Sequence, residues 1–153
     1  MKNTQHCQTI INQWQQDYQK LHDILNDEQL ALEKRDFEKL ARVTGEKNQL
    51  VAQINAHQLP PVIDQRGTTI TSLNDFKHYC ISNDELESKW VGLMNLVEQC
   101  RFKNEVNARL VELLNQSSRR TFNLIKGFDP DNNIYNANGN RTAVRHYSDS
   151  LSA

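Results

Sequence analysis

Residues 84–126 read DELESKWVGLMNLVEQCRFKNEVNARLVELLNQSSRRTFNLIK, and this stretch decides the fold. Its apolar and small polar residues recur at alternating spacings of four and three, which is typical of the packed seam of a long helix. The seam positions are Leu86, Trp90, Leu93, Val97, Cys100, Asn104, Asn107, Val111, Leu114, Ser118, Thr121 and Ile125. Ser82 and Glu85 have the spacing of a capping box, and Gly127 and Pro130 end the pattern. The sequence predicts a helix over about residues 84–126.

A second seam fills the first third of the chain. It runs through Ile11, Trp14, Tyr18, Leu21, Leu25, Glu28 and Leu32, shifts by one residue, and resumes as Phe37, Leu40, Val43, Leu50, Val51 and Ile54. Pro60 and Pro61 stop it, because proline lacks an N–H and disfavours the α region in the residue before it. We predict one helix over about residues 4–57.

The stretch between the two long helices has no such period over residues 58–70, which predicts a loop. Ser72 and Asp75 then indicate the start of a short helix over about residues 72–81. Long helices joined by a connection of this length pack antiparallel most simply. The predicted fold is all-α: an elongated antiparallel helical bundle of two long helices plus a short connecting helix, over residues 1–128.

Residues 129–153 are rich in Asn, Asp, Ser and Gly and too poor in apolar residues to fold alone, so we predict a flexible tail. Val144, Tyr147 and Leu151 are nevertheless spaced three and four apart. A short amphipathic helix would form there if a partner covered this stripe. The alternative is an end of the chain without a function.

The totals exclude several classes of protein. The 153 residues carry 18 Lys+Arg and 19 Asp+Glu, and this near-neutral balance argues against binding to nucleic acid. The mean hydropathy is -0.75 and no apolar run is long enough for stable membrane insertion, so we expect a soluble, cytoplasmic protein. Three widely spaced cysteines, Cys7, Cys80 and Cys100, are expected to be reduced structural thiols.

Catalytic motifs are missing from the sequence. Bundle enzymes with two irons need repeated Glu-x-x-His pairs, and the nearest approach, Asp75-x-x-His78, occurs once. No glycine-rich phosphate loop, nucleophile elbow or HExxH sequence occurs. We therefore expect no enzymatic activity, no metal and no cofactor.

Three polar residues, Glu28, Asn104 and Asn107, occupy seam positions and must find hydrogen bonds there. Either they fix the register between helices, as a seam asparagine does in coiled coils, or part of the seam faces a second protein. Apolar residues beside the seam widen the apolar face beyond one helix contact, and either the short helix or a second protein covers the excess. These residues are Leu96, Val106, Leu110, Leu113 and Leu124.

Taken together, the order and spacing of these motifs resemble the FlgN family of flagellar export chaperones, over nearly the whole chain. The matching positions are Leu21, Leu25, Glu28, Leu32, Leu40, Lys47 to Leu50, Trp90, Leu93, Cys100, Asn104, Asn107 and the tail stretch from Tyr135 to Gly139. The resemblance implies a chaperone that binds hook-filament junction proteins (hook-associated proteins 1 and 3) and delivers them to the flagellar type III export gate.

On that resemblance, the later part of the last helix and the tail contact the client through Leu110, Leu113, Leu124, Val144, Tyr147 and Leu151. Tyr135 and Gly139 are the implied contact with the export gate. Two alternatives stay open: a structural coiled-coil protein that forms a homo-oligomer through its seams, and a metal-dependent bundle enzyme.

Deleting residues 129–153 tests the tail. We expect the helical content and the thermal unfolding to stay nearly unchanged, because the predicted helices end before the tail, while partner binding weakens. Circular dichroism and a binding titration with hook-associated protein 1 measure the two effects. Equal affinities of the full-length and truncated proteins would contradict a role for the tail.

Overall fold

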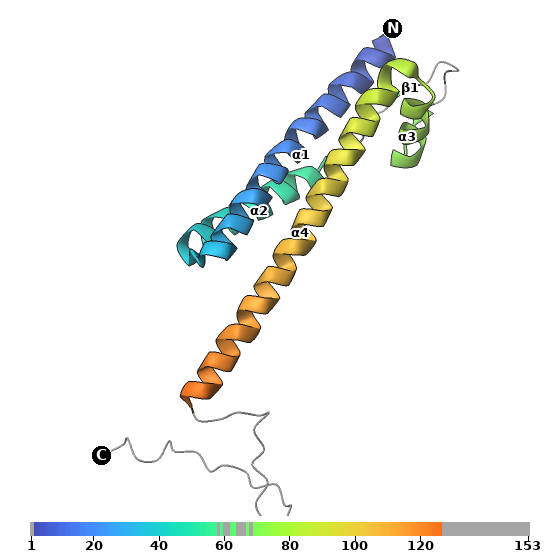
Figure 1. The fold of residues 1–153 in the computed structure, drawn as a ribbon. Coiled ribbons are helices and arrows are strands. Elements are labelled where there is room, and N and C mark those ends of the chain that lie inside the picture. Colours follow the sequence, from blue (N-terminus) through green and yellow to red (C-terminus); the bar gives the residue numbers. More distant parts are fainter. Residues whose placement is uncertain (1, 58, 60–61, 64–66, 68, 127–153) are drawn as a thin grey trace, which may run out of the picture. The chain divides into compact units, whose positions relative to one another are not determined.

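The described residues form four helices and one short pair of strands, shown in Figure 1. The computed structural model describes residues 2–57, 59, 62–63, 67 and 69–126. The elements are α1 (Lys2–Lys34), α2 (Phe37–Asn55), β1 (Val62–Ile63), β2 (Thr69–Ile70), α3 (Leu73–Ile81) and α4 (Asp84–Ile125). The all-α class is confirmed, as are the short helix and the last long helix. The described residues up to Ala108 belong to one compact unit and those from Arg109 to a second.

The predicted helix over residues 4–57 is wrong, because the chain turns back at Arg35 and Asp36. Arg35 has a positive φ of 53°, and its N–H donates to the carbonyl of Leu32 while that of Asp36 donates to the carbonyl of Ala31. These two bonds form a Schellman motif, which ends α1. The Asp36 side chain then caps α2 by accepting from the backbone N–H of Lys39 at 3.0 Å.

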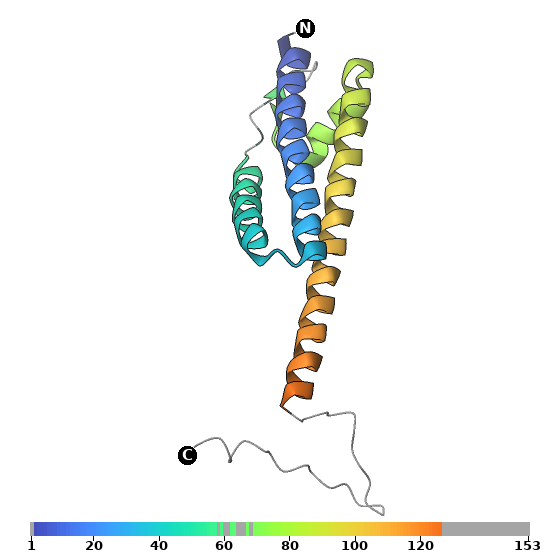
Figure 2. The same cartoon turned by 60° about the vertical axis from the view of Figure 1, so that its left-hand side comes forward.

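Side-chain contacts between helices give their directions in the first unit. Where α1 is bonded to α4, the residue numbers increase along both helices together: Asn12 bonds with Lys89, Tyr18 with Cys100, and Leu25 with Asn107. Between α1 and α2 the residue numbers change in opposite directions: Asp17 pairs with His57, just past the end of α2, and Asp27 pairs with Lys39. Helices α1 and α4 are therefore parallel, and the antiparallel neighbour of α1 is α2 (Figure 2), contrary to the predicted antiparallel pair of long helices.

The predicted loop over residues 58–70 contains a small hairpin, in which Val62 pairs with Ile70 and Ile63 with Thr69. Val62 and Ile70 point into the core, and Ile63 and Thr69 are exposed. Strands of two residues are too short for their alternation to be recognised in the sequence.

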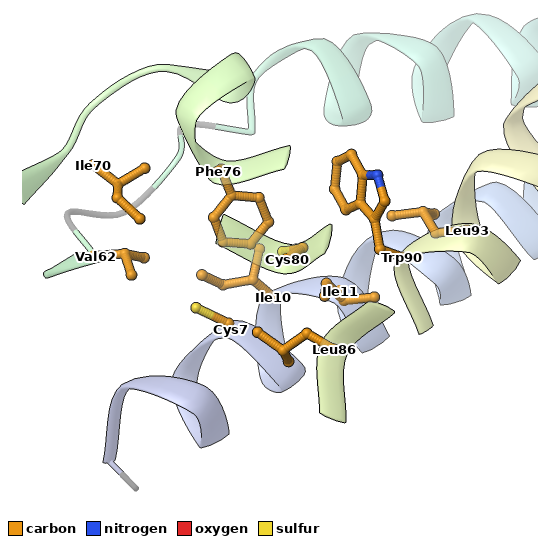
Figure 3. Packing of buried hydrophobic residues seen from close by; sticks show 10 residues of the cluster. All are labelled: Cys7, Ile10, Ile11, Val62, Ile70, Phe76, Cys80, Leu86, Trp90 and Leu93. Atoms are coloured by element: carbon orange, nitrogen blue, oxygen red, sulfur yellow. The ribbon is translucent and has the colours of Figure 1, made fainter. Parts of the chain in front are cut away.

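The main core lies where the hairpin, α3, the start of α1 and the start of α4 meet (Figure 3). Phe76 of α3 is at its centre, with its ring edge-on to Trp14 at 5.7 Å and to Trp90 at 5.8 Å between centroids. The other buried members are Cys7, Ile10, Ile11, Val62, Ile70, Cys80, Leu86 and Leu93. A second cluster, Leu21, Leu25, Leu50 and Cys100, joins α1, α2 and α4.

Caps explain why the short helix and the last helix begin where they do. Ser72 accepts a bond from the N–H of Asp75 at 3.1 Å, as predicted. For α4, Asn83 accepts from the N–H of Glu85 at 3.1 Å, so Asn83 and not the predicted Ser82 is the cap. Ser82 instead donates to the carbonyl of His78 at 2.7 Å.

All three cysteines are free and buried. Burial raises the pKa of Cys80 to about 12 and that of Cys100 to about 11, and it raises the pKa of Cys7 as well. The folded protein therefore holds these thiols protonated, and the unfolded chain ionises them near the ordinary value of 9.0.

Stability should consequently fall as the pH rises above about 9, because the unfolded chain then binds fewer protons than the folded one. The slope approaches about 1.4 kcal/mol per pH unit for each thiol that ionises only on unfolding. Urea unfolding followed by circular dichroism at increasing alkaline pH measures it. The slope should be shallower for Cys80→Ala, and an identical slope would show that Cys80 does not contribute.

Candidate functional site

A buried polar cluster ties three helices of the first unit together. The Glu28 carboxylate of α1 accepts from Lys47 Nζ of α2 at 2.5 Å through Oε1 and from Asn107 Nδ2 of α4 at 2.8 Å through Oε2. Asn107 Nδ2 also donates to the backbone carbonyl of Leu25 at 2.9 Å. Glu28 and Asn107 are both buried, and Lys47 is largely so.

The cluster fixes register, because a buried charge that loses its partner is strongly destabilising. Lys47 neutralises Glu28 from one side and the Asn107 amide bonds it from the other. Sequence reasoning placed Glu28 and Asn107 in the seam but did not pair either with Lys47. Asn104 is exposed, so it is not part of this cluster, and its contact with a second protein stays a prediction.

The candidate binding surface for a partner lies on the last part of α4, residues 109–125, in the second unit. Leu113 is 61% exposed and Leu124 is 69% exposed, whereas Leu110 is half-buried. Val111, Phe122 and Ile125 are also exposed. We call the set Leu110, Leu113, Leu114, Leu124 and Ile125 the leucine face, because helical spacing brings these five to one side.

Charged and amide residues occupy the opposite side of this helical segment. They are Glu112, Asn115, Gln116, Arg119 and Asn123 by the same helical spacing. An apolar stripe opposite a polar one is the pattern of a helix that buries one face against another helix. The chemistry that suits such a surface is hydrophobic contact with an amphipathic helix.

A groove of about 700 Å³ in the first unit was not predicted. Its walls come from α1, α3, the first part of α4, and the end of α2 with Leu59 just beyond it. The apolar lining residues are Trp14, Tyr18, Ile54, Leu59, Leu73, Trp90, Leu93, Met94 and Val97. Among the described lining residues, Asp17 is the one carboxylate, and it is fully buried. Sequence reasoning missed the groove because it depends on the turn at Arg35, which brings the end of α2 back to α1.

Other predicted contact residues lie outside the part of the chain that the structure describes. They are Tyr135, Gly139, Val144, Tyr147 and Leu151. Among the described residues, no group of three His, Cys, Asp or Glu side chains could hold a metal ion. None of the described helices has the length and apolar character that crossing a membrane requires.

Comparison with known families adds the decisive observation. The family model described as FlgN protein matches residues 1–143. The chain belongs to the FlgN family. No curated protein and no solved structure gave a match.

FlgN proteins are flagellar export chaperones, a family that is not enzymatic. The match spans the Glu28 cluster, the groove and the whole leucine face, and it extends into the tail as far as residue 143. Tyr135 and Gly139 therefore fall inside the matched region, and Val144, Tyr147 and Leu151 fall just beyond it.

Replacing Asn107 by Ala tests the polar cluster. It removes the bonds to Glu28 and to the Leu25 carbonyl, and we expect a loss of about 1–3 kcal/mol in the free energy of unfolding, because a buried acceptor loses its partner. Chemical denaturation measures the loss. The matched control is Asn104→Ala on the same helix, where an exposed amide should change stability by less than about 0.5 kcal/mol. Equal effects of the two substitutions would mean that the cluster adds nothing.

Proposed function

We propose that the protein is a cytoplasmic chaperone that binds hook-filament junction subunits, prevents their premature assembly and delivers them to the flagellar type III export gate. The proposed clients are hook-associated proteins 1 and 3. The family match carries the proposal, and the leucine face supports it.

The physical argument begins with the exposed side chains. Leu113, Leu124 and Ile125 expose most of their surface, and such side chains gain free energy by leaving water, at about 25 cal/mol per Å² buried. A client segment that becomes helical in the flagellum carries a complementary apolar stripe. When the leucine face of the chaperone covers the apolar stripe of the client, client subunits cannot associate with one another through that stripe.

The residues proposed for client contact are Leu110, Leu113 and Leu124 on α4, together with Val144, Tyr147 and Leu151 in the tail. Tyr135 and Gly139 are the proposed contact with the export gate. A tyrosine suits this role because its ring gives apolar area and its hydroxyl a hydrogen bond at little cost in side-chain entropy.

Self-association is the second candidate, since the same leucine face could pair with a second copy of the chain. The two functions differ in what the face binds. Light scattering of the protein alone, and then with hook-associated protein 1, separates a stable homo-oligomer that ignores the client from a chaperone that forms a complex with it.

Leu113→Asp tests the leucine face directly. The side chain is exposed, so we expect the helical content to stay the same and the affinity for hook-associated protein 1 to fall at least about tenfold, since a buried carboxylate without a partner is unfavourable. Titration calorimetry measures the affinity. The matched control is Asn115→Asp, which places the same charge on the polar side of the same segment and should bind normally. Unchanged binding by Leu113→Asp would exclude this face as the client surface.

A further inference from the structure

Asp17 on α1 is a buried carboxylate whose two oxygens differ in their hydrogen-bond partners. Oδ2 accepts from Gln13 Nε2 at 3.2 Å and lies 3.4 Å from His57 Nε2. Oδ1 is buried and has no hydrogen-bond donor among the described residues. Lys20 Nζ is 3.8 Å from Oδ1, beyond hydrogen-bond distance, and its side chain is 64% exposed.

This is an unfavourable arrangement unless something else supplies a donor. A buried carboxylate oxygen without a hydrogen bond costs free energy, and more so when the group carries charge. Asp17 is among the residues that line the groove, and its side chain is fully buried, so a donor that bonds to this carboxylate from the groove has to displace the side chains that cover it. The chemistry that suits it is a cationic donor, because charge-assisted hydrogen bonds to carboxylates are the strongest kind.

The other residues that line the groove suit the apolar stem and the charged head of a cationic side chain. Trp14, Tyr18 and Trp90 line the groove together with aliphatic side chains. Arginine and lysine have apolar stems that pack on such surfaces, and their charged heads are attracted to aromatic rings. Lys77 is the only lysine among the described lining residues, and it is exposed to solvent, which screens its charge.

We propose that this groove binds a segment of another protein by taking up an arginine or lysine side chain, whose head bonds to Asp17 while neighbouring apolar residues of the segment cover the rim. A protein segment is favoured over a small cation because the volume of about 700 Å³ exceeds one side chain and because Leu73, at the rim, is 60% exposed. None of the groove residues belongs to the leucine face, so this site is additional to the proposed client surface.

The chain offers a specific probe, because it has two tryptophans, Trp14 and Trp90, and both line the groove. The ligand is a short helical peptide without tryptophan that carries one arginine with a leucine one turn before and one turn after it. A matched peptide has citrulline, which keeps the shape and removes the charge. We expect saturable quenching or a shift of tryptophan emission with the arginine peptide, and binding at least about tenfold weaker with the citrulline peptide.

Asp17→Asn should remove the preference for arginine over citrulline. The matched control is Asp23→Asn, an exposed carboxylate on the same helix that does not line the groove, and it should keep the preference. A preference that survives in Asp17→Asn, or no saturable signal with the arginine peptide, overturns the proposal. So does butylguanidinium that binds as tightly as the peptide, because the site would then be one for small cations.

A second variant keeps the test decisive if Asp17→Asn fails to fold, as judged by circular dichroism. Leu73→Ser alters an exposed side chain of the rim and should leave the fold intact. It should weaken the arginine peptide severalfold, by removing apolar contact with the leucines on either side of the arginine. Unchanged affinity in this variant overturns the proposed seating of a protein segment. These outcomes do not depend on the leucine face, so the proposal for the groove would stand even if the leucine face bound no client.

Discussion

The carboxylate of Glu28 is removed from water in the interior of the first unit, and leaving it unpaired there would strongly destabilise the fold. Lys47 and Asn107 meet this requirement from two different helices. A slip of one helix by a turn would move either partner about 5.4 Å away and leave the charge unpaired. The axial register of α1, α2 and α4 in this unit is therefore constrained by the Glu28 carboxylate.

The turn between α1 and α2 follows from the same requirement. In one straight helix, Lys47 would lie about 28 Å along the axis from Glu28, out of reach of any side chain. The one-residue shift of the seam before Phe37 and the capping residue Asp36 were signals of the turn. The residue that takes the left-handed conformation, however, is Arg35, and this position usually holds glycine or asparagine. Its residue type gave no indication of a helix end.

The bounds of the last helix could be predicted closely because the capping residues and the seam indicate the same start. The spacing of the seam residues did not predict which of them are buried. Leu86, Leu93, Cys100 and Asn107 lie seven residues apart and are all buried. The other seam series goes from buried Trp90 through half-buried Val97 to exposed Asn104. Trp90 of that series lies against Phe76 of α3. A regular spacing predicts which residues share a side, whereas burial also needs a neighbouring element at that height.

The two candidate surfaces require different chemistry from a partner. The leucine face offers hydrophobic area, so a leucine-rich helix satisfies it without any charged contact. The groove contains a buried carboxylate oxygen, which an aliphatic side chain cannot bond and which a cationic donor can. Neither the leucine pattern nor the composition pointed to Asp17, because one acidic residue beside a helical seam has no distinguishing spacing. A partner that uses both surfaces must present an apolar stripe and a basic residue as separate features of its sequence.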